Sequence, residues 1–499
     1  MARIVVIGAG MGAMTAAARL AVAGHRVVVY ERAGTYGGAL GRVERDGFAF
    51  DTGPALLQLP AVYRDLFIKT GKEPLEKCVE LSQVEPAVRH VFADGTTADL
   101  PNASRAGVGE ALDAALGDGA GARWAAFMNR AREAWDRTRR PLLEEPLWPN
   151  WEVLAEREPY PSVPHKRLLR RERRAATLTE VGELELGGDA RLVALLEQFA
   201  LAQGLDPRTT PASAAVLPYL EQTFGVWSAR GGMRALARAV YERCLARRVE
   251  FVFDAAVTRI VEKDGRAAGV ELADGTTAEA DFVVAGVAPA ALDAMLPGVG
   301  IRSAGDVPAR SGMPSRLTVL LALSGARPEG TPHRTVLHTA DRRDELDRLF
   351  GERPGLPDSP TLTVLRPDDP DLTPDGAHEA VTLTATVPAH LDVTEADALR
   401  VISRAERVIP ELSGRLLWHE VRAPADIAEA TGAEGGAVPA PALAASGGRL
   451  LHPSNSTGLP GLFAVGGWSH PGGGLPHAGM SGTLAAGLIV EGPEFRGSQ

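Results

Sequence analysis

Two histidines, His470 and His477, lie in the run WSHPGGGLPHAGMSG at residues 468–482 and have the most scope for chemistry in this chain. An imidazole can take up a proton near neutral pH, and glycines let the main chain approach a group that is not protein. Either ring could instead serve only as a hydrogen-bond partner for the backbone. The run therefore predicts either a ligand lying against the main chain or a plain glycine loop, and it does not decide between them.

A second glycine-rich stretch opens the chain. The β-branched run at residues 3–7 leads into G-x-G-x-x-A, a helical stretch follows to residue 23, and the apolar run at 26–30 ends on an acid. This order of strand, glycine turn, helix, strand and acid is the dinucleotide-binding unit. Its glycines permit a tight turn and close approach to a pyrophosphate, and the acid can accept hydrogen bonds from a ribose. The residues that we expect to contact the dinucleotide here are Gly8, Gly10, Met11, Gly12, Ala13, Glu31 and Arg32.

The stretch GGALGRVERDGFAFDTGP at residues 37–54 narrows the choice of dinucleotide cofactor. Together with Glu31 it resembles the amino-terminus of the phytoene desaturase family, which is related more distantly to flavin amine oxidases. The resemblance implies FAD, with Gly37 and Gly38 near the pyrophosphate, and Gly53 and Pro54 of FDTGP near the flavin. Where many members read GGR this chain has Ala39, so whether Arg42 takes over a phosphate contact is left open.

The middle and the end of the chain continue the resemblance. Residues 225–290 read as a glycine turn, a helix and strands joined by DG turns, and Val257 falls where the family's backbone meets the adenine. Residues 461–490 resemble the family's VGxxTHPGxGxP segment, which wraps the flavin and leads a helix N-terminus toward it. The terminal residues that this implies as FAD contacts are Gly467, Gly474, Leu475 and Pro476.

The fold class that follows is α/β, with an amine-oxidase-like, Rossmann-type FAD domain interleaved with an antiparallel-sheet substrate domain and a helical cap. We expect the FAD domain to be assembled from residues 1–95, 216–294 and 441–499, the helical cap from 96–215, and the substrate domain from 295–440.

Composition removes other classes of function. A net charge of −10 over 499 residues gives no basic footprint for nucleic acid, and Cys78 and Cys244 lie too far apart for zinc spacing, so no metal is expected. The apolar start is too short to span a bilayer and continues into the dinucleotide unit, which favours a cytoplasmic protein. The basic run at 165–174, with Trp148, Trp151 and Tyr160 before it, leaves peripheral contact with an anionic membrane open. Oligomeric state is not indicated.

The chemistry implied is that of the flavin. A hydrocarbon C–H is too weak an acid to be deprotonated first, so we expect hydride to leave to the flavin, with a base then taking a proton from the adjacent carbon. For His470, whose counterpart recurs in the family, we favour a structural role; His477, where many relatives carry glycine, is the better candidate for the base. Weaker candidates are Glu221 and Arg230.

Three classes of enzyme and one binding protein fit this pattern. The resemblance implies a desaturase of a hydrophobic conjugated or isoprenoid substrate. The alternatives are a tailoring enzyme that oxidises or reductively remodels a polyene or polyketide-type product, a flavin amine oxidase, and a non-catalytic protein like the GDP-dissociation inhibitors. Only one credible dinucleotide motif is present, so NAD(P)H would have to bind without a second such unit. The sequence leaves the electron acceptor open, and oxygen or a quinone could reoxidise the flavin instead.

Overall fold

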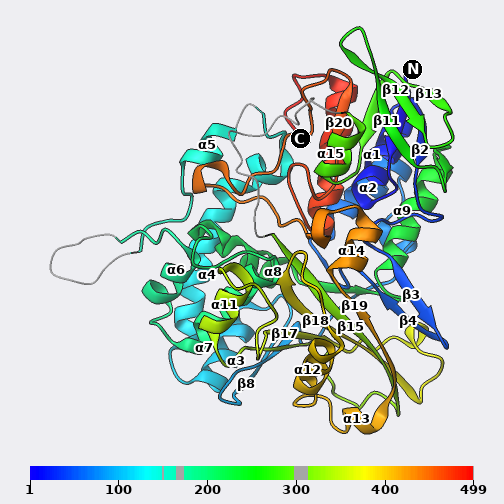
Figure 1. Cartoon of the computed structure of the whole chain (residues 1–499). Helices are drawn as coiled ribbons and strands as arrows, with labels where there is room; N and C mark the ends of the chain where they lie inside the picture. Colours follow the sequence, from blue (N-terminus) through cyan, green and yellow to red (C-terminus); the bar gives the residue numbers. More distant parts are fainter. Residues whose placement is uncertain (149–150, 164–172, 297–312, 498–499) are drawn as a thin grey trace.

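The computed structural model describes residues 1–148, 151–163, 173–296 and 313–497. Figure 1 shows a parallel sheet with its helices, near both chain ends, above an antiparallel sheet, with a group of helices beside them. Strands of the parallel sheet come from the start, the middle and the end of the chain. The predicted interleaved α/β architecture is therefore confirmed.

The parallel sheet has the order β10-β2-β1-β14-β20. Its strands are β1 (Arg3–Ile7), β2 (Arg26–Tyr30), β10 (Glu250–Val252), β14 (Phe282–Ala285) and β20 (Leu462–Ala464). In β1, Ile4 and Val6 face one core and Val5 and Ile7 face another. A strand that is buried on both faces carries consecutive apolar, often β-branched, residues. The sequence RIVVI therefore predicts a strand inside a covered parallel sheet.

Helices cover one face of this sheet and a small antiparallel sheet covers the other. The helices are α1 (Met11–Val22), α2 (Ala61–Gly71), α9 (Arg234–Ala246) and α15 (Leu475–Glu491), and the small sheet is β11 (Val257–Lys263), β12 (Arg266–Leu272) and β13 (Thr277–Glu279). At the β11–β12 hairpin both Asp264 and Gly265 have positive φ, as the DG dipeptide predicts.

Helices α1 and α15 touch along their backbones. A Cβ on Gly482 would lie 2.8 Å from the amide nitrogen of Ala16, and one on Gly12 would lie 2.9 Å from the carbonyl oxygen of Ala478. Glycine is needed at both positions, because any side chain would separate the helices. The contact brings the N-terminal parts of both helices together.

The second domain is built on a seven-stranded sheet of order β19-β15-β18-β17-β16-β7-β8, antiparallel except between β7 and β16. Its strands are β7 (Val88–Val91), β8 (Thr97–Leu100), β15 (Pro314–Ser324), β16 (Arg334–Leu337), β17 (Leu362–Leu365), β18 (His378–Pro388) and β19 (Leu416–Arg422). Helix α12 (Glu395–Ala405) packs on one face. The boundary expected between residues 95 and 96 falls inside the β7–β8 hairpin, so both strands belong to this sheet; the division of the chain into domains otherwise stays a prediction.

A helical group forms the third part. It contains α3 (Arg105–Leu116), α4 (Ala120–Arg139), α5 (Trp151–Glu156), α6 (Leu178–Glu185), α7 (Ala190–Ala202) and α8 (Val216–Phe224). Its core, around Trp124 and Phe127, also takes in Val88 and Phe92 from the β7 region. Apolar burial therefore joins the helices to the sheet.

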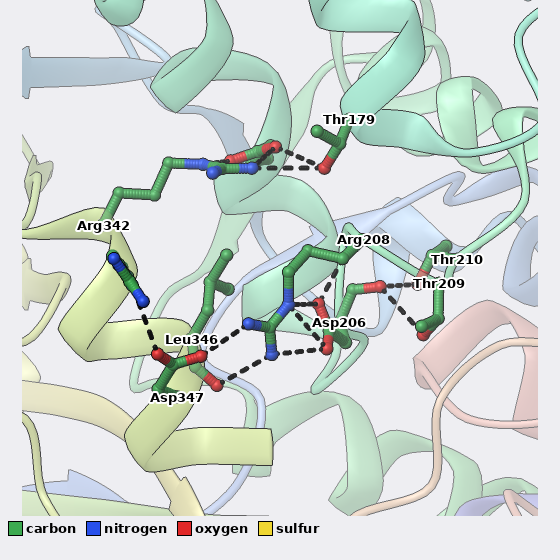
Figure 2. Close-up of polar contacts among 10 residues, drawn as sticks. Thr179, Asp206, Arg208, Thr209, Thr210, Arg342, Leu346 and Asp347 are labelled. Atoms are coloured by element: carbon green, nitrogen blue, oxygen red, sulfur yellow. Dashed lines mark hydrogen bonds and ion pairs between the residues drawn. The ribbon is translucent and has the colours of Figure 1, made fainter. Parts of the chain in front are cut away.

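Polar contacts join the same helices to α11 (Arg342–Phe350) (Figure 2). The Arg208 guanidinium donates to the carboxylates of Asp206 (3.0 Å) and Asp347 (2.7 Å), and Arg342 donates to the Thr179 hydroxyl (3.2 Å) and to the buried carboxylate of Glu197 (2.5 Å). These charge-assisted bonds fix the cap on the second domain.

The remaining elements connect these parts. They are β3 (Arg42–Arg45), β4 (Phe48–Asp51), β5 (Leu57–Gln58), β6 (Leu81–Gln83), β9 (Val226–Ala229), α10 (Pro289–Met295), α13 (Leu412–Arg415) and α14 (Pro424–Thr431).

Candidate functional site

The first glycine loop leaves one stretch of backbone uncovered. Gly8 turns with φ +89° and donates its amide to the Tyr30 carbonyl (2.8 Å), and Gly12 is packed against Gly466. Apart from its own chain neighbours, none of the described residues places an atom within 4 Å of where a Cβ on Gly10 would be. Ala13 is small because Gly286, at the end of β14, lies directly against it. The loop thus offers at Gly10 a bare cradle at the N-terminus of α1, which begins at Met11 and is suited to a phosphate.

The paired glycines lie beside this cradle. The Gly37 amide donates to the Ala9 carbonyl (2.8 Å), and Gly37 and Gly38 both have positive φ. A Cβ on Gly38 would lie 3.1 Å from the Gly10 Cα. Two motifs that the sequence separates by 27 residues therefore form one surface of bare backbone.

Glu31 closes the far end of the loop. One carboxylate oxygen accepts from the amide of Ala9 (2.7 Å) and the other from that of Ala33 (2.9 Å). Each oxygen keeps a second lone pair, so both can still accept from a ribose. The Glu31 carbonyl accepts from the Ala255 amide (2.9 Å), which brings Val257 near this end, and Arg32 donates to the Glu429 carbonyl.

Arg234, at the start of α9, holds the paired-glycine turn and was missed by sequence reasoning. Its guanidinium donates to the carbonyls of Leu40 (2.8 Å) and Tyr36 and stacks 4.2 Å from the centroid of the Tyr36 ring. Arg42 points elsewhere: it donates to the Gly231 carbonyl (2.8 Å) and pairs with Glu44 (2.8 Å). The arginine that supports the turn thus comes from RGGMR, about 200 residues away, where only its place before a helix could have drawn notice.

The FDTGP segment is tied to α9. Asp51 accepts from the backbone amides of Met233 (2.6 Å) and Arg234 (3.1 Å), so its carboxylate caps that helix. Burial raises the pKa of Asp51, and the two amides, Arg42 and Arg234 act in the opposite direction. Gly53 has no room for a side chain because the Ala39 carbonyl lies against it, and Pro54 follows on the exposed side.

The terminal glycine run is built against the chain at Pro439. A Cβ on Gly467 would lie 2.7 Å from the Pro439 ring, and Gly474 caps α15 with φ +106°, directly before Leu475 and Pro476. Asn455 holds this run in place, and it is a second residue that no sequence motif indicated. Its side-chain amide lies 2.9 Å from the His470 carbonyl and 3.0 Å from the Ser481 hydroxyl.

The two histidines have different surroundings. The His470 ring is fully buried, and its Nε2 lies 2.9 Å from the Glu145 carbonyl. A carbonyl only accepts, so Nε2 carries the proton, and Nδ1 has no hydrogen-bond partner among the described residues. Burial lowers the pKa of His470 to about 4. This ring fixes the loop to the segment at Glu145.

The His477 ring lies on the first turn of α15 and keeps part of its surface uncovered. None of the described residues hydrogen-bonds to it. Desolvation lowers the pKa of His477 to about 4, so the ring is neutral at pH 7 and has a nitrogen free to accept a proton.

The weaker candidates have structural partners. Glu221 accepts from Arg334 (3.0 Å) and from Gln58 (2.9 Å), and the pair is almost fully buried. Arg230 is exposed and pairs with Asp371 (2.9 Å).

The residues that could contact a membrane differ in exposure: the Trp148 side chain is 57% exposed, whereas Tyr160 is buried. Residues 164–172 of the basic run lie outside the described residues. No helix in the described part of the chain is both long and apolar enough to cross a bilayer.

The N-terminal parts of α1 and α15 meet at the carboxyl edge of a parallel sheet, with bare glycine backbone from three separate motifs around them. Positive helix ends and free amides favour an anionic dinucleotide there. The fold and site define a protein class in which an interleaved parallel sheet presents bare glycine backbone and helix N-termini suited to a phosphate-bearing cofactor.

The chain belongs to the family described as flavin containing amine oxidoreductase, whose model matches residues 14–490. It is 31% identical to a 4,4'-diapolycopene oxygenase of Methylomonas sp, over 98% of each chain. It is also 31% identical to a hydroxyneurosporene desaturase of Rhodobacter capsulatus, over 98% of this chain and 97% of the relative. An oxidoreductase from Methanosarcina mazei shares the fold, with a TM-score of 0.62 at 16% identity over 96% of this chain and 99% of its own. Family and relatives make the chain an oxidoreductase enzyme of a flavin-containing family, which leaves the non-catalytic alternative without support.

Proposed function

We propose that this protein binds FAD and removes a hydride and a proton from a hydrophobic conjugated or isoprenoid substrate, which leaves a new C=C bond. Carotenoid desaturases and oxygenases are similar to it along nearly the whole chain. The single observation that carries the proposal is the neutral, unpartnered ring of His477 on the first turn of α15. It provides a base at the end of the glycine run.

The residues available to hold FAD are those of the glycine cradle. Bare backbone at Gly10 and Gly38 fits the pyrophosphate, Glu31 fits a ribose, and the backbone near Val257 fits the adenine. Gly53 and Gly467 are held close to Ala39 and Pro439, and with Gly474 they are the glycines whose main chain would lie nearest the flavin if the resemblance holds. When bound, FAD supplies the two-electron acceptor for the hydride.

His477 then completes the reaction. Loss of hydride leaves positive charge that neighbouring double bonds of the substrate spread, and this makes the C–H on the next carbon acidic. The neutral imidazole takes that proton and passes it to solvent, so the substrate has lost two hydrogens in all. His470 keeps the loop fixed and Glu221 stays paired, and neither touches the proton. Oxygen or a quinone would accept the electrons from the flavin, and the exposed Trp148 would touch a membrane that holds the substrate.

The test is an absorption spectrum of the purified protein under anaerobic conditions, before and after phytoene is added in detergent micelles. We expect an FAD spectrum that bleaches while polyene bands appear. In His477→Gln the spectrum should show FAD, but the polyene bands should appear roughly a hundredfold more slowly, because the proton is lost after the hydride. An FAD spectrum that stays oxidised with phytoene and with hydroxyneurosporene would overturn the proposed reaction, and a protein that takes up no FAD on reconstitution would overturn the cofactor.

A further inference from the structure

The face of the seven-stranded sheet opposite α12 is polar at its centre. Side chains alternate along the central strands: Leu317, Val319, Leu383 and Val364 pack toward α12, so their neighbours point the other way. Among these neighbours, Thr318 of β15 lies directly opposite Thr384 of β18, which lies directly opposite Thr363 of β17. Three threonines thus form one row across three adjacent strands, and Thr382 lies next to it on β18. We call these four residues the threonine floor.

The floor lies inside the molecule. At one end Leu320 and Ala322 pack under Phe48 and Phe50 of β4. At the other end the Thr386 hydroxyl donates to the Leu201 carbonyl of α7 (3.0 Å). Beyond Thr363 the row continues to Val336, which belongs to the apolar core of the helical group. The floor is therefore bounded by β4, by α7 and by the core of the helical group.

The four hydroxyls are available. Each threonine of the floor is partly exposed, and none has a hydrogen-bond partner among the described residues. Central strands facing an all-hydrocarbon ligand would be expected to carry apolar side chains on this face, as they do on the face toward α12. Threonine also favours strands for its shape alone, and valine would serve that purpose without the hydroxyl.

A cavity of about 200 Å³ adjoins the floor and has an acidic lining. Thr382 belongs to its lining, and four carboxylates outnumber the single arginine there: Asp51, Glu80, Asp368 and Asp369 against Arg230. Carboxylates disfavour a ligand that is itself an acid. Hydroxyl groups on a ligand suit both the acidic lining and the threonine floor. They can donate hydrogen bonds to the carboxylates, and they can donate to or accept from the threonine hydroxyls.

We infer that the substrate carries neutral hydroxyl groups, which the threonine floor binds, and is not a pure hydrocarbon. This inference rests on the proposed function and names the substrate class within it. Each threonine hydroxyl that meets a substrate hydroxyl would favour the hydroxylated compound over its parent by about three- to tenfold.

The test compares hydroxyneurosporene with its parent hydrocarbon neurosporene on the FAD-loaded protein. Binding is followed anaerobically by perturbation of the flavin spectrum, and turnover by polyene absorption. We expect wild type to bind the alcohol at least about fivefold more tightly. Thr384→Val should remove most of that preference and leave neurosporene unchanged, and Thr384→Ser should keep it. Thr97→Val, on the exposed edge strand of the same sheet, is the control and should behave as wild type.

Failures of the two proposals are separable. Equal binding and turnover of both compounds, or a preference that Thr384→Val leaves intact, overturns the threonine floor and leaves the desaturase standing. Tighter binding of the alcohol without turnover of either compound supports the floor and overturns the desaturation. If neither compound binds, both proposals fall.

Discussion

The guanidinium of Arg234 lies where a side chain at position 37 would have to be. It donates to the carbonyl of Leu40 at 2.8 Å, and that same carbonyl would lie 2.8 Å from a Cβ on Gly37. The glycine pair is thus a turn packed around a cation from a distant helix, and it is more than a flexible loop. Because Gly38 faces Gly10, the arginine supports the surface that we assign to the pyrophosphate.

Replacing Arg234 should weaken FAD binding without unfolding the protein. Arg234→Met removes charge-assisted bonds to two carbonyls and to the Thr35 hydroxyl, and the turn loses its support. We expect a loss of roughly 2 kcal/mol in FAD affinity, or about thirtyfold in Kd, measured by titration of the apoprotein. The control is Arg238→Met on the same helix, whose side chain is exposed and pairs only with Glu242. Equal Kd values for the two variants would show that Arg234 does not shape the site.

Alanine substitutions at two glycines of the first motif should have different effects, one on FAD binding and the other on stability. Gly10→Ala adds a methyl group that meets no protein atom, and its φ of −74° suits alanine, so the free energy of unfolding of the apoprotein should not change. FAD binding should fall at least tenfold, since the methyl occupies the cradle. Gly12→Ala meets Gly466 and the Ala478 carbonyl within 3 Å, and should destabilise the apoprotein by about 2–3 kcal/mol in urea unfolding. A Gly10→Ala variant that binds FAD normally would remove Gly10 from the site.

The glycine motifs could be predicted from the sequence because each is local: strand, turn, helix and acid follow one another within about 30 residues. Their partners could not. Asp51 caps a helix 182 residues later, and Arg234 supports a turn 194 residues earlier. Asn455 and the threonine row carry no motif and gain meaning only from sheet register and loop packing. The β7–β8 hairpin likewise belongs to the second domain because β7 pairs with β16. These strands lie far apart in the chain, so a local sequence pattern could not predict their pairing.

The pH dependence of turnover should identify the base. A base must be neutral to act, and burial lowers the pKa of His477 to about 4. Turnover that depends on His477 should stay level from pH 8 to about 5 and fall only near pH 4, whereas a histidine of ordinary pKa would lose activity near 6.5. The measurement is the single-turnover rate at which the polyene bands appear, followed against pH. A midpoint near 6.5 that persists in His477→Gln would assign the proton to another group.

Folding stability should fall as the solution is acidified. Six of the described histidines have lowered pKa values: His25, His90, His333, His338, His470 and His477. Between pH 6.5 and about 4 the unfolded chain binds protons at these residues and the folded chain does not, so stability declines as pH falls. Glu158 and Glu345, with pKa values raised to about 7, act in the opposite direction between pH 7 and 4.5. Burial also raises the pKa of Asp51 and of Glu185, which adds to this opposing effect.

The six histidines outnumber the four acids, so we expect a net slope of about two protons, or roughly 3 kcal/mol per pH unit, near pH 5. Urea unfolding at pH 7, 6 and 5 measures it. Glu345→Gln removes one of the acids that oppose the histidines. The loss of stability with falling pH should therefore become steeper by the equivalent of about one bound proton. Stability that is constant or that rises from pH 6.5 to 5 would contradict the buried neutral histidines.

The Glu221–Arg334 pair should prove to be a structural contact beside the floor and not a second base. Both side chains are almost fully buried, so Arg334→Met leaves the carboxylate with only Gln58 and should cost about 3 kcal/mol of unfolding free energy. The double variant Arg334→Met with Glu221→Leu removes both charges and should recover most of that loss, because neither then needs solvation. The rate of polyene formation per folded molecule should stay within about threefold of wild type in the double variant. A hundredfold loss there, with FAD still bound, would instead give Glu221 a part in the proton transfer.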